Sequence, residues 1–243
     1  MIELKNVSKK YGNKEIFKDL NFTVDSGEIV GFIGPNGSGK TTTINMIAGI
    51  TKIDNGNILI NGKDILKNEI EVKKNIGLVP DEPNIFQRFK VKELFKFIAE
   101  MYEVEQTEYE KRLTELTKEF DIVQYLDTEI SELSHGTRQK VNIISVLLHN
   151  PDIWILDEPL TGLDPQSAFK LKNIMKAHAK NNKTVFFSTH VLEVAEKLCT
   201  KIIIINDGVK IYEGTLEKLK SEYPEYTSLE ELFLHLINNG KKK

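Results

Sequence analysis

Residues 34–41 read Gly-Pro-Asn-Gly-Ser-Gly-Lys-Thr and match the pattern G-x-x-x-x-G-K-[ST], which is typical of phosphate-binding loops. Gly34 and Gly39 bracket the loop, and its backbone N–H groups can point inward because no bulky side chain obstructs them. The pattern places Lys40 at the β- and γ-phosphates of a nucleoside triphosphate and the Thr41 hydroxyl at Mg²⁺. The other residues expected to line the nucleotide are Pro35, Asn36, Gly37, Ser38 and Thr42.

The sequence on either side distinguishes this loop from an ordinary glycine-rich turn. Residues 28–33 (Glu-Ile-Val-Gly-Phe-Ile) read as a buried strand, and residues 41–48 read as a helix. The N-terminus of that helix adds partial positive charge where the phosphates would lie. The alternative interpretation, a glycine-rich turn that happens to precede a helix, does not explain why a strand, this loop and a helix follow one another. The sequence therefore predicts that the chain binds a nucleoside triphosphate.

Composition narrows the class of protein. The 243 residues are enough for one α/β core with an inserted subdomain, and Cys199, the only cysteine, is typical of a reducing compartment. A net charge of −3, with scattered lysines, indicates no surface for nucleic acid or for an anionic membrane. The longest apolar runs, such as residues 202–205, are far shorter than the ~20 residues that span a bilayer. We expect a soluble, cytoplasmic protein without direct membrane insertion.

Apolar periodicity outlines the rest of the chain. Alternating or continuous apolar runs predict strands at residues 2–7, 20–24, 57–60, 76–79, 152–156, 184–188 and within a hairpin at 201–213. Helical spacing predicts helices within an insertion at residues 91–150, at 166–180 and at 229–237. The expected parts are an antiparallel β subdomain and first core part (1–85), a helical subdomain (86–150), a second core part (151–225) and a C-terminal helix with a basic tail (226–243).

A second set of polar residues follows the later strands. Asp157 and Glu158 come directly after the apolar residues 153–156, and strand alternation points them in different directions. Asp157 is placed to hold Mg²⁺, and Glu158 to orient or deprotonate the attacking water. His190 follows residues 185–189 at the edge where α/β sheets bind ligands, so it can contact the γ-phosphate or the water. The alternatives are solvated acids that open a loop and a structural histidine.

These motifs, in this order, resemble the nucleotide-binding subunit of ATP-binding cassette (ABC) transporters across nearly the whole chain. Residues 133–139 (Leu-Ser-His-Gly-Thr-Arg-Gln) look like the family signature Leu-Ser-Gly-Gly-Gln, and residues 161–165 look like the loop that crosses the dimer interface. Tyr11 matches the aromatic residue that stacks on adenine, although an incidental exposed tyrosine is the alternative. The resemblance implies a P-loop NTPase core of mostly parallel sheet flanked by helices, with an antiparallel β subdomain and an inserted helical one.

The resemblance also implies how two chains cooperate. Ser134 and Gly136 open a helix at about residues 137–148, whose N-terminal N–H groups suit an anion. In the family each ATP lies between one chain's phosphate loop and the other's signature, so the expected partner is a second copy or a homologous ATPase subunit. Asp164 is the interface aspartate, and His190 matches the switch histidine. ATP and Mg²⁺ are the implied ligands.

Three positions depart from the family pattern. His135 replaces the first glycine of the signature, and Thr137 replaces its glutamine. Asp81 stands where the family usually has a glutamine that contacts Mg²⁺ and the water, with Glu82 as an alternative ligand. We expect an active site with altered metal affinity or coupling.

The resemblance leads to an ATPase subunit that drives transport through separate integral membrane permease subunits. Residues 86–97 form the expected docking surface, because Ile85, Phe86 and Phe89 are more apolar than a solvent-exposed loop requires. The alternative is that these residues pack locally against the helical insertion. The ending Ser228-Leu-Glu-Glu-Leu-Phe233 is similar to that of drug, bacteriocin and polysaccharide exporters, which favours export. The expected location is the inner face of the cell membrane. The alternatives are a soluble ABC ATPase of iron–sulfur assembly and a regulator that scarcely turns over.

Overall fold

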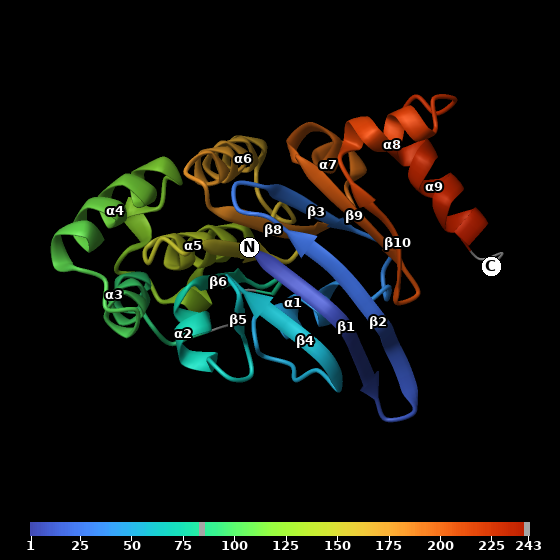
Figure 1. The fold of residues 1–243 in the computed structure, drawn as a ribbon. Coiled ribbons are helices and arrows are strands. Elements are labelled where there is room, and N and C mark those ends of the chain that lie inside the picture. The colour runs from blue at the N-terminus through green and yellow to red at the C-terminus, as the bar shows by residue number, and fades with distance from the viewer. Residues whose placement is uncertain (83–85, 241–243) are drawn as a thin grey trace.

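Two β-sheets form the centre of the molecule in the computed structural model, which describes residues 1–82 and 86–240 (Figure 1). The larger sheet has the order β10-β9-β3-β8-β7-β6, with every neighbouring pair parallel except β10 and β9. Its strands are β3 (Ile29–Ile33), β6 (Ile76–Val79), β7 (Ile153–Leu156), β8 (Thr184–Thr189), β9 (Lys201–Asn206) and β10 (Val209–Gly214). The antiparallel sheet β2-β1-β4-β5 consists of β1 (Ile2–Tyr11), β2 (Lys14–Val24), β4 (Asn55–Ile60) and β5 (Lys63–Asp64).

The register of the larger sheet brings four strand ends together. Ile33 at the end of β3 pairs with Thr189 at the end of β8. Leu156 at the end of β7 pairs with Phe187 on β8 and with Val79 at the end of β6. Because these four neighbouring strands are parallel, the loops that follow them emerge side by side at one edge of the sheet.

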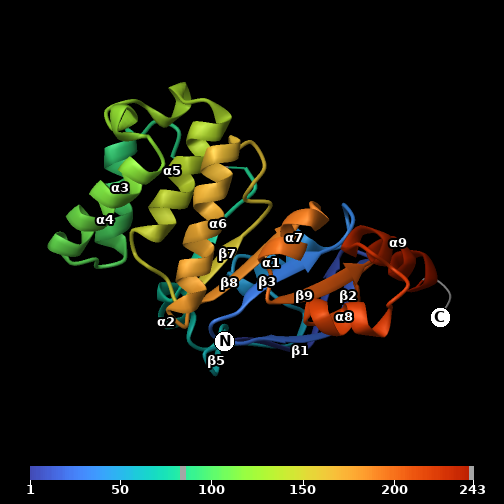
Figure 2. The same ribbon diagram turned by 90° about the horizontal axis from the view of Figure 1, so that it is seen from above.

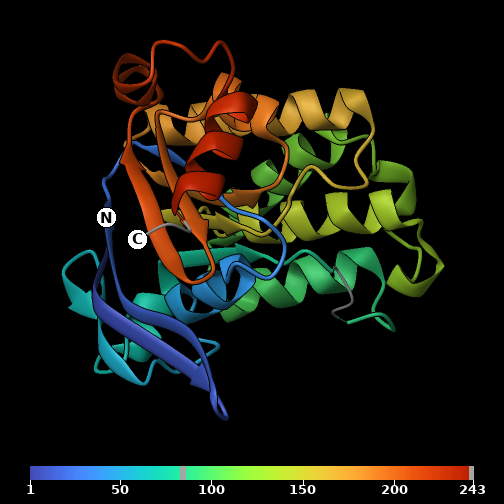
Figure 3. The same ribbon diagram turned by 90° about the vertical axis from the view of Figure 1, so that its right-hand side faces the viewer.

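The helices divide between the core and a separate group. The core helices are α1 (Lys40–Ile47), α2 (Glu69–Lys74), α6 (Pro165–Lys180), α7 (Leu192–Leu198), α8 (Leu216–Glu222) and α9 (Leu229–Gly240). The helical insertion consists of α3 (Val91–Met101), α4 (Gln106–Glu119) and α5 (His135–Leu147), with short 3₁₀ turns at Val123–Tyr125 and Ile130–Glu132. Figures 1 and 2 place α3 and α4 at the opposite end of the molecule from α8 and α9. Figure 3 shows that last pair in red near β10, on which α9 packs.

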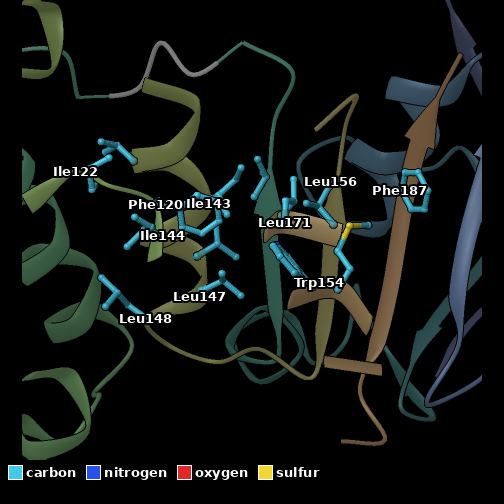
Figure 4. Packing of buried hydrophobic residues seen from close by; sticks show 14 of the residues in the cluster. Phe120, Ile122, Ile143, Ile144, Leu147, Leu148, Trp154, Leu156, Leu171 and Phe187 are labelled. Atoms are coloured by element: carbon cyan, nitrogen blue, oxygen red, sulfur yellow. The ribbon is translucent and has the colours of Figure 1, made fainter. Parts of the chain in front are cut away.

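Both faces of the five parallel strands are buried, so these strands read as mostly apolar runs, whereas the edge strand β10 is partly exposed. On β7, Trp154 and Leu156 belong to the cluster that includes α5 and α6, whereas Ile153 and Ile155 face α1 and the antiparallel sheet. The first cluster continues into the helical insertion, as Figure 4 shows for Phe120, Ile122, Ile143, Ile144, Leu147 and Leu148. This shared core fixes α5 relative to the strand that precedes Asp157.

The strands lie where the sequence predicts them, but β1 and β2 are longer than the predicted 2–7 and 20–24 because they pair as far as Tyr11 and Lys14, and several helix ends also differ. Helix α5 begins at His135, two residues before the predicted start, because the Ser134 side chain accepts a hydrogen bond from the Thr137 amide and caps the helix. The short helices α2, α7 and α8 were not predicted; each spans only six or seven residues and shows little periodicity. Within residues 1–82 and 86–240, none of the helices has the length and hydropathy required to cross a bilayer.

Two histidines with buried ring nitrogens make the stability of this fold depend on pH. His178 on α6 lies edge-on to Trp154, with ring centroids 5.5 Å apart, and burial lowers its pKa from 6.5 to about 4. His149 stacks on Tyr102 at 3.7 Å, and burial likewise lowers its pKa to about 4. Between pH 6.5 and 4 the unfolded chain binds protons that the folded chain excludes, so we expect stability to fall as the pH drops through this range. The loss is at most about 3 kcal/mol per histidine.

Urea unfolding at pH 7.5, 6 and 5 measures this loss, and the His178→Gln variant identifies its source. The variant is expected to lose less stability between pH 7.5 and 5 than the wild-type chain. An identical loss in both proteins would show that His178 does not contribute.

Candidate active site

The loop between β3 and α1 has no space for side chains at two of its glycines. A Cβ atom at Gly34 would lie 2.4 Å from the Ile205 carbonyl oxygen and 2.5 Å from the Ser38 Oγ. Gly39, the N-cap of α1, has a φ of 106°, and a Cβ there would lie 2.2 Å from the ring of Phe17. The Phe17 ring under the loop is a structural requirement that the pattern G-x-x-x-x-G-K-[ST] does not reveal. The two glycines keep the loop backbone bare.

Gly39→Ala is expected to destabilise the fold more than Gly37→Ala. Both glycines have positive φ, 106° and 79°, so both substitutions strain the backbone by roughly 1 kcal/mol. A Cβ at Gly37 would meet nothing within 4 Å, whereas one at Gly39 would collide with the buried Phe17 ring. Overpacking of this kind costs a further ~1–3 kcal/mol. Urea unfolding of the two variants measures the difference, and equal losses would contradict the role of Phe17.

Lys40 lies at the opening of this loop. Its Nζ donates hydrogen bonds to the carbonyl oxygens of Gly34 at 2.8 Å and Pro35 at 3.3 Å, and it lies 3.9 Å from Glu158 Oε1. The Ser38 Oγ is buried in the same loop and has no hydrogen-bond partner among the described residues. A buried ammonium group, an unpartnered hydroxyl and a helix N-terminus are together suited to an anion such as a phosphate chain.

The side chains of Asp157 and Glu158, which follow β7, have different partners. The Asp157 side chain is buried, and its Oδ1 accepts a hydrogen bond from the Ser188 hydroxyl on β8. Glu158 has a φ of 47°, donates its backbone N–H to the Ser188 Oγ at 3.0 Å and directs its carboxylate toward Lys40. Ser188 therefore holds the Asp157 carboxylate and the Glu158 backbone, although in the sequence it is only a polar residue within an apolar strand.

His190 lies beside the Glu158 carboxylate. Its Nδ1 is 2.9 Å from Glu158 Oε2 and, since a carboxylate only accepts, Nδ1–H is the donor in this bond. The backbone N–H of His190 points to the same oxygen at 3.4 Å. The imidazole is mostly exposed, whereas the Glu158 side chain is mostly buried. The strand ends thus bring together three of the residues predicted from sequence, Lys40, Glu158 and His190.

Asp81 faces the same carboxylates from the loop after β6. Its pKa is raised, first by burial and then by the negative charges of Asp157, Glu158 and Glu82. Carboxylate oxygens of this kind, together with the exposed Thr41 hydroxyl that follows Lys40 on α1, have the ligand chemistry that Mg²⁺ prefers. Among the described residues, no three His, Cys, Asp or Glu side chains are arranged to hold a metal alone. The residues therefore fit a Mg²⁺ ion that takes its other ligands from phosphate and water.

Tyr11 and the signature residues do not join this group within one chain. Tyr11 ends β1 half exposed, with the Lys9 ammonium 5.0 Å from its ring centroid. Ser134 uses its hydroxyl to cap α5, and a Cβ at Gly136 would lie 2.7 Å from the Gly162 carbonyl oxygen. Among the described residues, no hydrogen bond or ion pair links Tyr11, Ser134 or Gly136 to Lys40.

Asp164 is tied to its own chain. Its carboxylate caps α6 by accepting the Ser167 amide at 2.8 Å and pairs with the Lys140 ammonium on α5 at 2.9 Å. These partners hold the pKa of Asp164 well below its usual range. Helix α5, which begins in the signature, therefore contacts the loop at residues 161–164 of the same chain. The two motifs are far apart in the sequence, so the motifs alone do not predict this contact.

Comparison with known proteins identifies the family. A family model described as ABC transporter matches residues 17–161. The chain is 35% identical to the ABC transporter ATP-binding protein NatA of Bacillus subtilis (strain 168), with 99% of each chain covered. It is 33% identical to the Nod factor export ATP-binding protein I of Burkholderia lata, over 88% of this chain and 70% of that protein.

Solved structures give the same result. An ATP-binding subunit of an ABC transporter superposes with a TM-score of 0.93 at 32% identity, over 97% of this chain and 99% of that one. A dimeric ATP-binding cassette in a post-hydrolysis state, bound to ADP and Pi, has a TM-score of 0.80 at 28% identity, over 89% of this chain and 99% of that one. The chain therefore belongs to the family of ABC transporter ATP-binding proteins and is an ATPase.

Proposed function

We propose that two copies of this chain bind two ATP molecules with Mg²⁺ between them, head to tail, and that hydrolysis drives export through separate integral membrane subunits. The observation that carries the catalytic part is the group formed by Lys40, Glu158 and His190 at the phosphate loop. The separation of the signature from that loop within one chain supports the dimer, because the second copy supplies the missing N–H groups.

Each residue then has a distinct role. Lys40 exchanges its two carbonyl partners for β- and γ-phosphate oxygens, and the bare loop backbone binds the same phosphates. Glu158 accepts a proton from the attacking water, and His190 holds that carboxylate in place. Thr41, Asp157 and Asp81 would hold Mg²⁺, which neutralises the charge of the phosphates. Ser134 and Gly136 of the second copy cover the γ-phosphate from the N-terminus of α5.

Export is favoured by the names of the relatives. Besides the Nod factor export protein, the linearmycin resistance ATP-binding protein LnrL of Bacillus subtilis (strain 168) is 36% identical, over 91% of this chain and 71% of that protein. The relatives named above are ATP-binding proteins of transport or resistance systems, which disfavours a soluble ATPase of iron–sulfur assembly. A cytoplasmic position on the inner face of the membrane follows from this proposal.

An aromatic cluster supports the contact with the membrane subunits. Phe86, Phe89 and Phe97 pack with ring centroids 5.2–6.0 Å apart. Phe86 and Phe97 remain 40% and 39% exposed, and Phe86 has a φ of 54°. Phe89 contacts the core cluster, so packing within the helical insertion explains why this position is aromatic. That packing does not explain the two exposed rings, Phe86 and Phe97. Ile85, the other residue predicted at this surface, lies outside the described residues.

Affinity purification from detergent-solubilised membranes tests this function. A stoichiometric multi-span membrane protein is expected to accompany the tagged chain and to be lost from the Phe86→Ser/Phe97→Ser double variant. Phe169→Ser, at another exposed phenylalanine on α6, is the matched control and should retain it. A chain that hydrolyses ATP but brings down only a soluble partner would contradict the transport role.

A further inference from the structure

The side chain of Lys9 on β1 is buried although it carries a charge. Lys9 is only 9% exposed, and its ammonium group lies 3.5 Å from the Asp54 carboxylate and 5.0 Å from the centroid of the Tyr11 ring. Burying an ammonium group is unfavourable unless a carboxylate or an aromatic face compensates for the lost water. Lys9 has both partners, so its side chain is held in one place.

Asp54 holds this arrangement from a separate segment, the loop between α1 and β4. Its second carboxylate oxygen accepts the backbone N–H of Lys10 at 2.6 Å, and its own N–H donates to the Ser8 carbonyl oxygen at 3.0 Å. The pKa of Asp54 is lowered, first by the hydrogen bond from the Lys10 amide and also by the charge of Lys9. Asp54 is therefore a charged and fixed counterpart for the Lys9 ammonium group.

The Tyr11 ring ends β1 beside the turn to β2. Lys9 and Tyr11 are two residues apart on the strand, so their side chains lie on the same face, with the ammonium group over the ring. Tyr11 is 51% exposed, and its hydroxyl makes no hydrogen bond with a described residue. Exposed side chains at the end of a hairpin are usually free to change rotamer. Lys9 therefore restrains the ring from one side and leaves its other face open.

The cross-strand neighbour of Lys9 connects this ring to the phosphate loop. Lys9 pairs with Phe17 on β2, and a Cβ atom at Gly39 would lie 2.2 Å from the Phe17 ring. Directly paired residues of antiparallel strands are about 5 Å apart and share a face of the sheet. The Phe17 ring under the loop, the ammonium group and the Tyr11 ring therefore follow one another along one face of the hairpin.

We infer that Lys9 is a positioning residue for the base of the bound nucleotide. Its ammonium group, held by Asp54, fixes the Tyr11 ring from one side, and the base stacks on the other side. This inference rests on the proposed function, because it takes the phosphates to lie in the loop that begins at Gly34. A ring that is already ordered loses little freedom when the base binds, so the base is held more tightly. Lys9 acts through Tyr11 and therefore affects the base and not the phosphates.

Calorimetric titrations with ATP and with inorganic triphosphate test the inference, because only ATP carries a base. Both are carried out without Mg²⁺, so that neither ligand is hydrolysed. Lys9→Met removes the charge and keeps the length, Lys9→Arg keeps the charge, and Tyr11→Ala removes the ring alone or together with Lys9→Met. Lys10→Met is the control, because it makes the same change of charge at the next residue, whose exposed side chain pairs with Glu15. Lys9→Gln covers the case in which Lys9→Met fails to fold.

The Lys9→Met chain is expected to bind ATP about three- to tenfold more weakly than the wild-type chain and to bind inorganic triphosphate equally well. The Lys9→Arg and Lys10→Met chains should bind both ligands as the wild-type chain does. In the Tyr11→Ala chain, Lys9→Met should cause no further loss of ATP affinity, because the ring through which Lys9 acts is absent.

Three results for Lys9→Met would overturn the inference and leave the proposed function intact. They are equal losses of affinity for ATP and triphosphate, no loss for either ligand, and a loss for ATP that persists in the Tyr11→Ala chain. Unchanged ATP affinity in Tyr11→Ala would also overturn it, because no base would then lie on the ring. A wild-type chain that binds neither ligand would contradict the proposed function as well.

Discussion

The Glu158→Gln variant is expected to hydrolyse ATP about 10²- to 10⁴-fold more slowly than the wild-type chain, which is the usual contribution of a positioned general base. The glutamine side chain has nearly the same shape and keeps one oxygen for His190 Nδ1, which lies 2.9 Å from the carboxylate. It cannot accept a proton from water, so hydrolysis is lost while ATP binding is kept. Phosphate release at saturating ATP and Mg²⁺ measures the effect.

Asp152→Asn is the matched control for this variant. Asp152 directly precedes β7, whereas Glu158 lies just beyond the other end of the same strand, so the control makes the same chemical change at the opposite edge of the sheet. The control should turn over at the wild-type rate. Near-wild-type hydrolysis by Glu158→Gln, or an equal loss in Asp152→Asn, would contradict the assignment of Glu158 as the base.

Lys40→Met is expected to lower the affinity for ATP by about 10²-fold or more, because a hydrogen bond from a charged group contributes roughly 1.5–3 kcal/mol and Lys40 makes more than one. Methionine keeps much of the length and apolar contact of lysine, so the loop should remain folded. The ammonium group donates hydrogen bonds to the carbonyl oxygens of Gly34 and Pro35, and phosphate oxygens would take the place of these acceptors when ATP binds. Calorimetric titration with ATP measures the dissociation constant.

Lys176→Met serves as the control for Lys40→Met, since Lys176 is exposed on α6 away from the loop. Its affinity for ATP should equal that of the wild-type chain. If Lys40→Met also bound ATP with unchanged affinity, the phosphate loop would not be the nucleotide site.

The features that the sequence predicts correctly are those encoded by neighbouring residues. The phosphate loop is specified by a strand, a glycine-rich turn and a helix that follow one another, so its conformation can be inferred from residues 28–48 alone. The side chains of Asp157 and Glu158 have different partners, as strand alternation predicts, although β7 ends at Leu156 and the φ of 47° at Glu158 is what turns its side chain. The approach of Glu158 to Lys40 follows from the parallel order of the strands, which the alternation of strands and helices predicts.

The features that the sequence does not predict are contacts between distant segments. Ser188 orients Asp157 and Glu158 from the neighbouring strand, and its hydroxyl has no motif to identify it. The Phe17 ring leaves no space for a side chain at Gly39, but Phe17 is on β2 of the antiparallel sheet, far from the loop in sequence. The start of α5 is different, because a serine followed by helical residues is a cap signal, and Ser134 could have been recognised as one.

His135, which replaces the first glycine of the signature, also makes its contact with a segment far away in the sequence. A Cβ atom at Gly162 would lie 2.4 Å from the His135 Cδ2, so the imidazole packs closely on the loop that leads to Asp164. The sequence identified His135 as a replacement for glycine but gave no partner for the larger side chain. A second tie between α5 and this loop is the ion pair of Lys140 with Asp164.

The mass of Glu158→Gln in solution with ATP and Mg²⁺, measured by light scattering, tests the central claim most directly. One chain has a mass of 27.8 kDa. We predict that ATP with Mg²⁺ converts the variant to a species of twice that mass holding two ATP molecules, because hydrolysis no longer separates the copies. A variant that binds ATP and keeps the mass of a single chain would contradict the head-to-tail dimer.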